Sequence, residues 1–369
     1  MRVLQFAKRS VSLLAVLSIA LTGCSGDSGP DVPFNPAGTS ADLEAVNAAY
    51  GSSAFVSFSA MSYLFDGAFT GAPLISSSVA AIDLKARGAG GMRAGAVRSA
   101  KRLAGILAAG RNKTWSASST GIPTTAMIPA EVAGKTYEYS GGTYVPTDRT
   151  GAPANGARFL LYAVDPVTYL PVEPLVETGY VDITDLSGGN TQSVRLEVVS
   201  GGTTYVEYTV VANTTTGTIS VIGFVSDGTQ QANLNLSASV SSNGLTLLYG
   251  LTVPQRDVSI ALRLTASDLD LETGTIEVVI SMSGPNGAVS MTGQFTTTGA
   301  TLTVRTNGTT FATITVSGTA EPVITGADGQ PITDEDAAAL LGVFDLTAQA
   351  FGSFDQLLTP VSFFLEPAA

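Results

Sequence analysis

The stretch SVRLEVVSGGTTYVEYTVVAN, residues 193–213, decides the fold of this chain. Apolar residues occupy most even positions on both sides of Gly201-Gly202, while Arg195, Glu197, Glu207 and Thr209 lie at the odd positions between them. Successive side chains of a strand point to opposite faces, so this period of two indicates strands that bury one face. Because a Gly-Gly pair tolerates the positive φ angles of a tight turn, the stretch predicts an antiparallel hairpin.

The same alternation recurs from Lys135 to Thr319, with Asn-Gly, Asp-Gly, Gly-Gly and Thr-Gly pairs between the apolar runs. Short runs joined by tight turns favour pairing between consecutive strands, which is an up-and-down meander. No helical pattern interrupts the runs, and this excludes a parallel βαβ sheet. We expect roughly nine or ten strands across residues 134–326.

Helices are predicted on both sides of the meander, in segments 40–84 and 327–369. The first should begin with Ser40 as its N-cap and extend to about residue 66, with a break at Gly51. The second should begin after Thr333 in a Thr-x-x-Asp capping box and end at Pro360.

The predicted fold is therefore mainly β with flanking helices. A curved antiparallel meander, half-barrel or barrel-like, packs on an N-terminal and a C-terminal helix, because a one-sided sheet must cover its apolar face. A β-sandwich is the alternative. The aromatic residues expected between the helices and the sheet are Phe55, Phe58, Phe65, Phe344, Phe351 and Phe354.

The first residues of the chain indicate export and anchoring. Basic residues and a short apolar run precede Leu21-Thr22-Gly23-Cys24, and the run is too short to span a membrane. The four residues resemble the lipobox of bacterial lipoproteins. That resemblance implies a signal peptide at 1–23, a diacylglyceryl group on Cys24, cleavage before it, and acylation of the new amino terminus.

Residues 24–39 would then form a lipidated flexible tether. Ser25 after the cysteine resembles the pattern that directs lipoproteins to the outer membrane, so we expect that membrane rather than the inner one. An ordinary secretory signal with a chance cysteine is the alternative.

Composition excludes several chemistries. The chain has no His, 1 Cys, and 30 acidic against 18 basic residues. Without His or a second Cys there is no Ser-His-Asp triad, no disulfide and no ordinary zinc site, and the acidic balance argues against nucleic acid as a partner. We expect no cofactor and no catalytic residue; carboxylate, Ser-Lys and calcium chemistry are what composition leaves open.

Residues 85–113, within a Gly-rich segment at 85–133, hold eight basic residues and no acidic one. One interpretation is contact with anionic lipid head groups, with Val97 to Ala109 as a short basic helix. The other is a solvated excursion that offsets an acidic body, and composition favours this second interpretation.

One acidic cluster is a candidate for weak Ca²⁺ binding: Asp268, Asp270, Glu272 and Glu277. A turn at Thr273-Gly274 would set Asp270 opposite Glu277. The competing and favoured interpretation is a solvated hairpin tip. The apolar residues lie at even positions up to Leu264 and at odd positions at Leu269 and Leu271. This change also predicts a β-bulge or bend near Ala266-Ser267.

Two further groups have structural interpretations. The acidic residues Asp334, Glu335 and Asp336 lie behind Thr333 and are better explained as a helix cap than as a catalytic or metal cluster. Tyrosines beside prolines can bind sugars or peptides, but packing of a strand edge is the favoured interpretation for these five: Tyr137, Tyr139, Tyr144, Tyr162 and Tyr169.

The architecture is similar to the half-barrels of lipoprotein-carrier and lipoprotein-receptor domains of the bacterial envelope, although no motif supports the likeness. It implies an apolar ligand, such as an acyl chain, between sheet and helices. We therefore expect a non-catalytic, membrane-anchored envelope lipoprotein that binds such a ligand. A structural or adhesive surface lipoprotein without a ligand pocket is the alternative, and a carboxylate-based hydrolase is a third.

Overall fold

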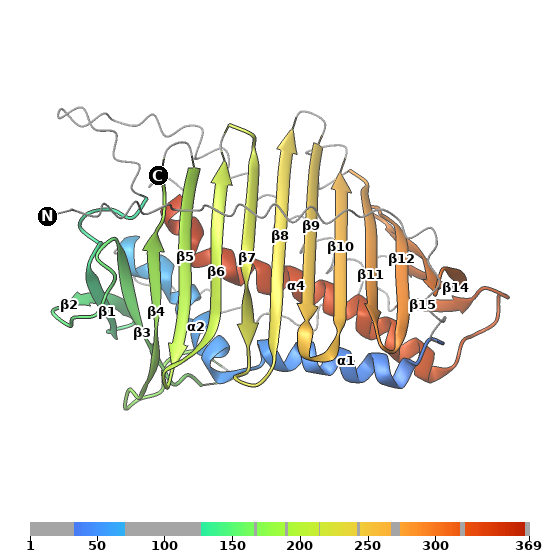
Figure 1. Cartoon of the computed structure of the whole chain (residues 1–369), viewed down its shortest axis with the longest axis horizontal. Helices are drawn as coiled ribbons and strands as arrows, with labels where there is room; N and C mark the ends of the chain where they lie inside the picture. Colours follow the sequence, from blue (N-terminus) through green and yellow to red (C-terminus); the bar gives the residue numbers. More distant parts are fainter. Residues whose placement is uncertain are drawn as a thin grey trace, which may run out of the picture. The chain divides into compact units, whose positions relative to one another are not determined.

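A sheet of fifteen strands dominates the structure, which is a computed structural model (Figure 1). The structure describes residues 33–70, 127–165, 168–188, 191–213, 215–241, 244–266, 274–317 and 322–365, excepting the side chains of 63–70, 241, 347–356 and 362–365. All of these belong to one unit, Val32–Ala369. The expected class, mainly β with flanking helices, is confirmed.

The strands follow one another along the chain: β1 (Lys135–Ser140), β2 (Thr143–Thr147), β3 (Gly156–Tyr162), β4 (Glu177–Asp185), β5 (Thr191–Ser200), β6 (Thr203–Asn213), β7 (Thr218–Ser226), β8 (Gln231–Ser241), β9 (Gly244–Val253), β10 (Val258–Ala266), β11 (Ile276–Gly284), β12 (Gly287–Phe295), β13 (Gly299–Thr306), β14 (Thr309–Ser317) and β15 (Val323–Gly326). A single 3₁₀ turn, η1 (Pro254–Arg256), joins β9 to β10. The helices are α1 (Pro36–Tyr50), α2 (Ser53–Thr70) and α4 (Asp334–Leu365).

The sheet is the predicted meander. From β3 to β15 each strand pairs antiparallel with the next strand in the chain, and the sheet stays open, with β2 at one edge and β15 at the other. One pair departs from the prediction: β1 runs parallel to β3, because the β1–β2 hairpin lies on one side of β1 and β3 returns to the other. The hairpin of residues 193–213 forms as β5 and β6, with Gly201 and Gly202 at φ 56 and 80°.

The strand count exceeds the expected nine or ten because six strands lack a clean alternation. β7 contains Gly223 and carries the apolar Ile222 and Phe224 on its polar side, which hides its period. β1 to β4 mix half-buried and buried residues on both faces, and β15 has only four residues. Alternation reveals a strand only where one face is dry and the other is wet.

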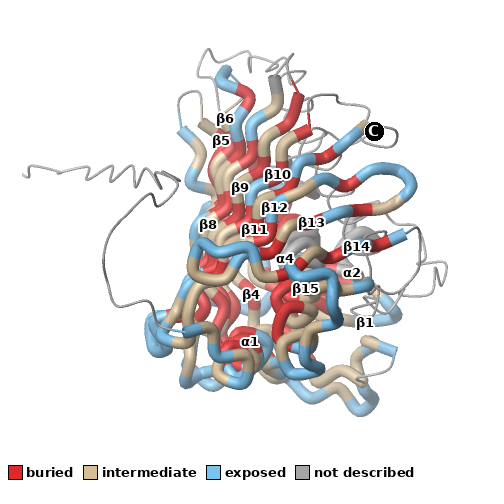
Figure 2. The backbone as a smooth tube through the Cα atoms, turned by 90° about the vertical axis from the view of Figure 1, so that its right-hand side faces the viewer, coloured by how far each residue is buried: buried red, intermediate tan, exposed pale blue. Residues whose placement is uncertain are grey.

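The three helices of the described residues lie on the apolar side of the sheet, here called the inner face. α4 crosses many strands behind the sheet, and α1 runs along one end of the strands (Figure 1). α1 contacts β7, β8 and α4, while α2 contacts β2 to β6 and α4. Buried residues alternate with exposed ones along the strands (Figure 2). The buried inner residues include Val181, Leu196, Val206, Val221, Leu236, Leu251, Leu262, Ile280, Met291, Val304 and Ile314.

Three of the aromatic residues predicted for this core are buried: Phe55, Phe58 and Phe344. The side chains of the other three, Phe65, Phe351 and Phe354, lie outside the described residues. No described helix is both long enough and apolar enough to span a membrane.

The first helix begins earlier than expected. Asn35, not Ser40, is the N-cap of α1: its Oδ1 accepts a hydrogen bond from the Gly38 N–H at 3.1 Å, and Pro36 occupies the first helical position. Proline there is favourable because that N–H needs no partner. The predicted break at Gly51 is confirmed, since α1 ends at Tyr50 and α2 begins at Ser53.

The last helix begins as predicted and ends later. Thr333 Oγ1 accepts a hydrogen bond from the Asp336 N–H at 3.2 Å, so Thr333 is confirmed as the N-cap. Asp336 closes the Thr-x-x-Asp box by accepting from the Thr333 hydroxyl at 2.6 Å. Pro360 was expected to end the helix, but it lies inside α4. Proline removes only its own N–H bond, and the surrounding turns, with Leu358 and Val361 buried in the core, hold the helix together.

Candidate functional site

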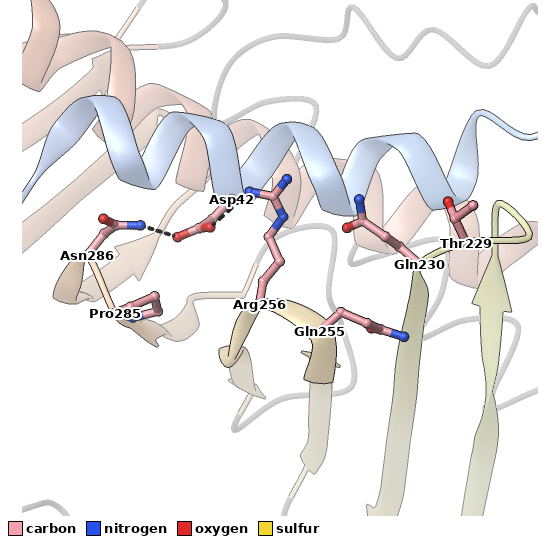
Figure 3. Close-up of a pocket in the computed structure, with 7 residues that line it drawn as sticks. All are labelled: Asp42, Thr229, Gln230, Gln255, Arg256, Pro285 and Asn286. Atoms are coloured by element: carbon pink, nitrogen blue, oxygen red, sulfur yellow. Dashed lines mark hydrogen bonds and ion pairs between the residues drawn. The ribbon is translucent and has the colours of Figure 1, made fainter.

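A polar pocket of about 590 Å³ lies at one end of the strands, beneath α1 (Figure 3). We call it the rim pocket. Three neighbouring connections form it: the β7–β8 loop, η1 and the β11–β12 hairpin. Its lining residues are Asp42, Thr229, Gln230, Gln255, Arg256, Pro285 and Asn286.

Asp42 is the buried charge of the rim pocket, with 5% of its side chain exposed. Its carboxylate accepts a hydrogen bond from Asn286 Nδ2 at 2.7 Å, and Arg256 Nη1 lies 3.7 Å from its other oxygen. A buried carboxylate requires such partners, because an unpaired charge away from water is strongly unfavourable. The pair leaves the pocket with no net formal charge.

The hairpin tip at Asn286 also fixes the beginning of α1. The Asn35 N–H donates to the Asn286 carbonyl at 3.0 Å, and Asn35 Nδ2 donates to Asn286 Oδ1 at 3.3 Å. Gly38 permits this approach, since a Cβ there would lie 2.2 Å from Asn286 Oδ1. The wall formed by α1 is therefore joined directly to the wall formed by the β11–β12 hairpin.

The β7–β8 loop is ordered by its own aspartate. Asp227 Oδ1 accepts from the Thr229 hydroxyl at 2.7 Å, from the Thr229 N–H at 2.8 Å and from the Gln230 N–H at 2.7 Å. Hydrogen bonds to the charged form, led by the one from the Gln230 backbone, lower the pKa of Asp227. Gln230 is thus held in a defined backbone position, yet its buried Oε1 has no hydrogen-bond partner.

A second pocket, of about 570 Å³, lies on the opposite, outer face of the sheet over β12 to β14. Its side chains are mainly threonines, and cross-strand pairs such as Thr292–Thr303 and Thr301–Thr315 place them in rows. Neither of these two pockets lies between the helices and the sheet. Most apolar side chains described on the inner face are buried, and the rings of Phe58, Phe159 and Tyr208 are fully buried.

Two tyrosine hydroxyls face each other where α1 meets the inner face. Tyr50 Oη and Tyr249 Oη are 3.1 Å apart. Desolvation raises the pKa of Tyr50 to about 12 and raises the pKa of Tyr249 well above its ordinary value. Both remain neutral at pH 7, so the pair joins α1 to β9 rather than supplying a base.

Raising the pH is therefore expected to leave Tyr50 neutral until about pH 12. Unfolded tyrosine titrates near about pH 10, so the folded state binds this proton more tightly. The resulting stabilisation is complete below about pH 10 and is lost as the pH rises through about 12. Ultraviolet titration of tyrosinate in the wild type and in Tyr50→Phe measures the step, and a Tyr50-dependent step near pH 10 instead of about pH 12 would show that Tyr50 is not buried.

The four residues predicted as a weak calcium site do not form a cluster within the described residues. Asp268, Asp270 and Glu272 lie outside the described residues. Glu277 is exposed and pairs with Thr265, so the expected register that set Asp270 opposite Glu277 is wrong. No group of three or more possible metal-ligating side chains occurs within the part of the chain that the structure describes.

The observed register has a clear physical reason. It sets Leu264 opposite Val278, so both side chains point to the inner face. The expected register would have set Leu264 opposite the exposed Ser283. Because a register shift by an odd number of residues moves side chains to the other face of a sheet, buried and exposed residues would then have shared one face. β10 stays regular through Ala266, and Ser267, at the predicted bulge, lies outside the described residues.

The tyrosines expected beside prolines pack the edge of the sheet. Tyr137 stacks on Phe159 with ring centroids 4.8 Å apart, and the Tyr144 hydroxyl donates to the Leu160 carbonyl at 2.8 Å. Tyr139 and Tyr162 join the same cluster, whereas Tyr169 lies on the β3–β4 connection with φ 57°. The packing interpretation is therefore confirmed for four of the five.

The remaining candidate residues either belong to the N-terminal cap of α4 or lie outside the described residues. Asp334, Glu335 and Asp336 form the first turn of α4, as the cap interpretation predicts. Cys24, the tether residues up to 32 and the basic residues 85–113 lie outside the described residues. The expected tether of residues 24–39 is too long, because Pro36 to Thr39 belong to α1.

Sequence reasoning missed the rim pocket. Its residues come from four places between 42 and 286, and only the strand order brings them together. The signal available was polar side chains in or beside the turn pairs Asp227-Gly228 and Asn286-Gly287. No family model, no curated protein and no solved structure matches this chain.

Proposed function

We propose that this chain is a lipid-anchored, non-catalytic protein of the bacterial cell envelope. Its β-domain serves as a rigid structural or adhesive module that presents polar surfaces, and the outer membrane is its expected location. The observation that supports the proposal is the burial of the inner face: the apolar side chains described there are covered by their neighbours, and the rim pocket and the outer-face pocket are lined mainly by polar side chains.

The anchor rests on the sequence Leu21-Thr22-Gly23-Cys24 and its resemblance to a lipobox. Two or three acyl chains at one residue hold a protein on a bilayer firmly, because each buried CH₂ contributes ~0.8 kcal/mol. The non-catalytic role is supported by composition, since a chain with no His and one lipid-bearing Cys has few nucleophile and base pairs available.

An apolar ligand between helices and sheet is the competing function. Such a ligand needs a channel that accepts an acyl chain, whereas inner residues such as Val194, Leu196 and Val206 are completely buried by neighbouring side chains. To admit an acyl chain, α4 would have to separate from the strands, and this is opposed by the hydrogen bond from Tyr208 Oη to the Leu357 carbonyl.

A fluorescent fatty acid distinguishes the two functions. The purified chain is titrated with the probe after removal of its own lipids, and we expect no saturable increase in fluorescence. Saturable binding that unlabelled palmitate displaces would overturn the structural role and support a carrier. Serum albumin, which binds fatty acids, controls for the activity of the probe.

A further inference from the structure

We propose that the rim pocket binds an uncharged, hydroxylated ligand of the saccharide class. The pocket is separate from the lipid anchor and from the inner face, so this proposal does not depend on the proposed function. Its volume of about 590 Å³ lies within the ~300–1,000 Å³ that is usual for small-molecule sites.

The charges of the rim pocket favour a neutral ligand. Arg256 is the cation among the lining residues and Asp42 the anion, and they lie 3.7 Å apart. An incoming phosphate or carboxylate would gain from Arg256 but would meet the repulsion of the Asp42 carboxylate. A neutral molecule has no such conflict, and its binding does not depend on screening by salt.

The hydrogen-bonding groups favour a ligand that both donates and accepts. At 3.7 Å, Arg256 is beyond hydrogen-bond distance from Asp42, so its guanidinium has N–H donors available for ligand oxygens. Gln255 accepts only one long bond, at 3.5 Å from the Gln231 N–H, and keeps its amide NH₂ for a ligand. A hydroxyl group matches such a mixed lining because it is donor and acceptor at once.

Gln230 provides the second, independent observation. Its Oε1 is buried in the wall of the pocket without a partner, although Asp227 fixes the loop that carries it. A buried acceptor without a donor is costly, and most such groups in native proteins have a partner. Gln230 lines the pocket, so a ligand hydroxyl that reaches Oε1 can supply the missing hydrogen bond.

The arrangement is also rigid enough to select a ligand. Asp42, Gln255 and Asn286 come from α1, η1 and the β11–β12 hairpin, and Figure 3 shows these elements around one opening. Hydrogen bonds join α1 to the hairpin at Asn286. Pro285 adds an apolar surface against which the C–H face of a sugar ring can pack.

Isothermal titration calorimetry of the full chain in detergent tests the proposal. The probes are maltose and N,N′-diacetylchitobiose, both uncharged disaccharides, with inorganic phosphate for comparison. We expect saturable binding of at least one disaccharide, unchanged between low and high salt, and weaker or no binding of phosphate. The absence of saturable disaccharide binding, or a preference for phosphate, would overturn the proposal.

Three variants locate the binding. Arg256→Gln and Gln255→Ala should each weaken disaccharide affinity about tenfold, the order expected for one lost charge-assisted or two ordinary hydrogen bonds. Gln255→Ala keeps the Asp42–Arg256 pair and loses only the long bond from the Gln231 N–H, so it should unfold at the wild-type temperature, which circular dichroism checks. Arg263→Gln, at an exposed position on the outer face of β10, is the matched control and should bind as the wild type does. Equal affinity of all three variants would place the sugar elsewhere and overturn the proposal.

Discussion

Gly223→Ala should lower the free energy of unfolding by about 3 kcal/mol, in the upper range for single substitutions. Gly223 lies in the middle of β7, opposite Tyr208 on β6. A Cβ at this position would lie 2.0 Å from the Glu207 carbonyl oxygen and 2.5 Å from the Cβ of Tyr208. The first of these atoms belongs to the backbone, so the strand itself must move.

The effect should extend to the helix layer. Tyr208 is fully buried, and its hydroxyl donates to the Leu357 carbonyl of α4. A shift of β6 therefore disturbs this hydrogen bond between the strand and the last helix, as well as the β6–β7 pairing. Urea denaturation followed by circular dichroism measures the loss.

Gly188→Ala is the matched control for Gly223→Ala. Gly188 is exposed, its φ is not positive, and a Cβ there would meet no atom within 4 Å. The control should unfold within about 0.5 kcal/mol of the wild type, as surface substitutions usually do. If the two variants were equally stable, the close β6–β7 approach would be wrong.

Cys24→Ser should abolish lipidation completely. The thioether to diacylglycerol needs the cysteine sulfur, and Cys24 is the only cysteine of the chain. Cells grown with an alkyne-labelled palmitate should therefore label the wild-type chain and leave the variant unlabelled. Residues 1–23 should also stay attached in the variant, because the resemblance to lipoproteins implies that cleavage follows lipidation.

Ser25→Ala is the control for this experiment, since it changes the neighbouring residue and keeps the sulfur. It should incorporate label as the wild type does. Label that persists in Cys24→Ser would place the lipid on another residue and contradict the lipobox interpretation.

Much of the fold was predictable because one face of the sheet is exposed to solvent and the other is buried. Alternation from Val194 to Val316 identifies β5, β6 and most later strands, and Asn-Gly pairs such as Asn307-Gly308 identify their turns. The Thr333 capping box was equally local, as it involves only neighbouring residues. Features of this kind depend on the chain near them and can be inferred without tertiary structure.

The features that were missed depend on distant contacts. Asn35 caps α1 while also binding the hairpin at Asn286, 251 residues away, and no local pattern indicates that choice over Ser40. The β10–β11 register is set by burial of Leu264 opposite Val278 rather than by the Thr273-Gly274 pair. The rim pocket is the extreme case, because each of its walls has an ordinary local sequence.

Native mass spectrometry of the protein extracted from membranes tests the central claim most directly. The proposed function predicts a chain that begins at Cys24, carries covalent acyl groups on that residue, and releases no other lipid when gently activated. An unmodified Cys24, or a noncovalently bound lipid in stoichiometric amount, would contradict the account of a lipid-anchored domain with a buried inner face.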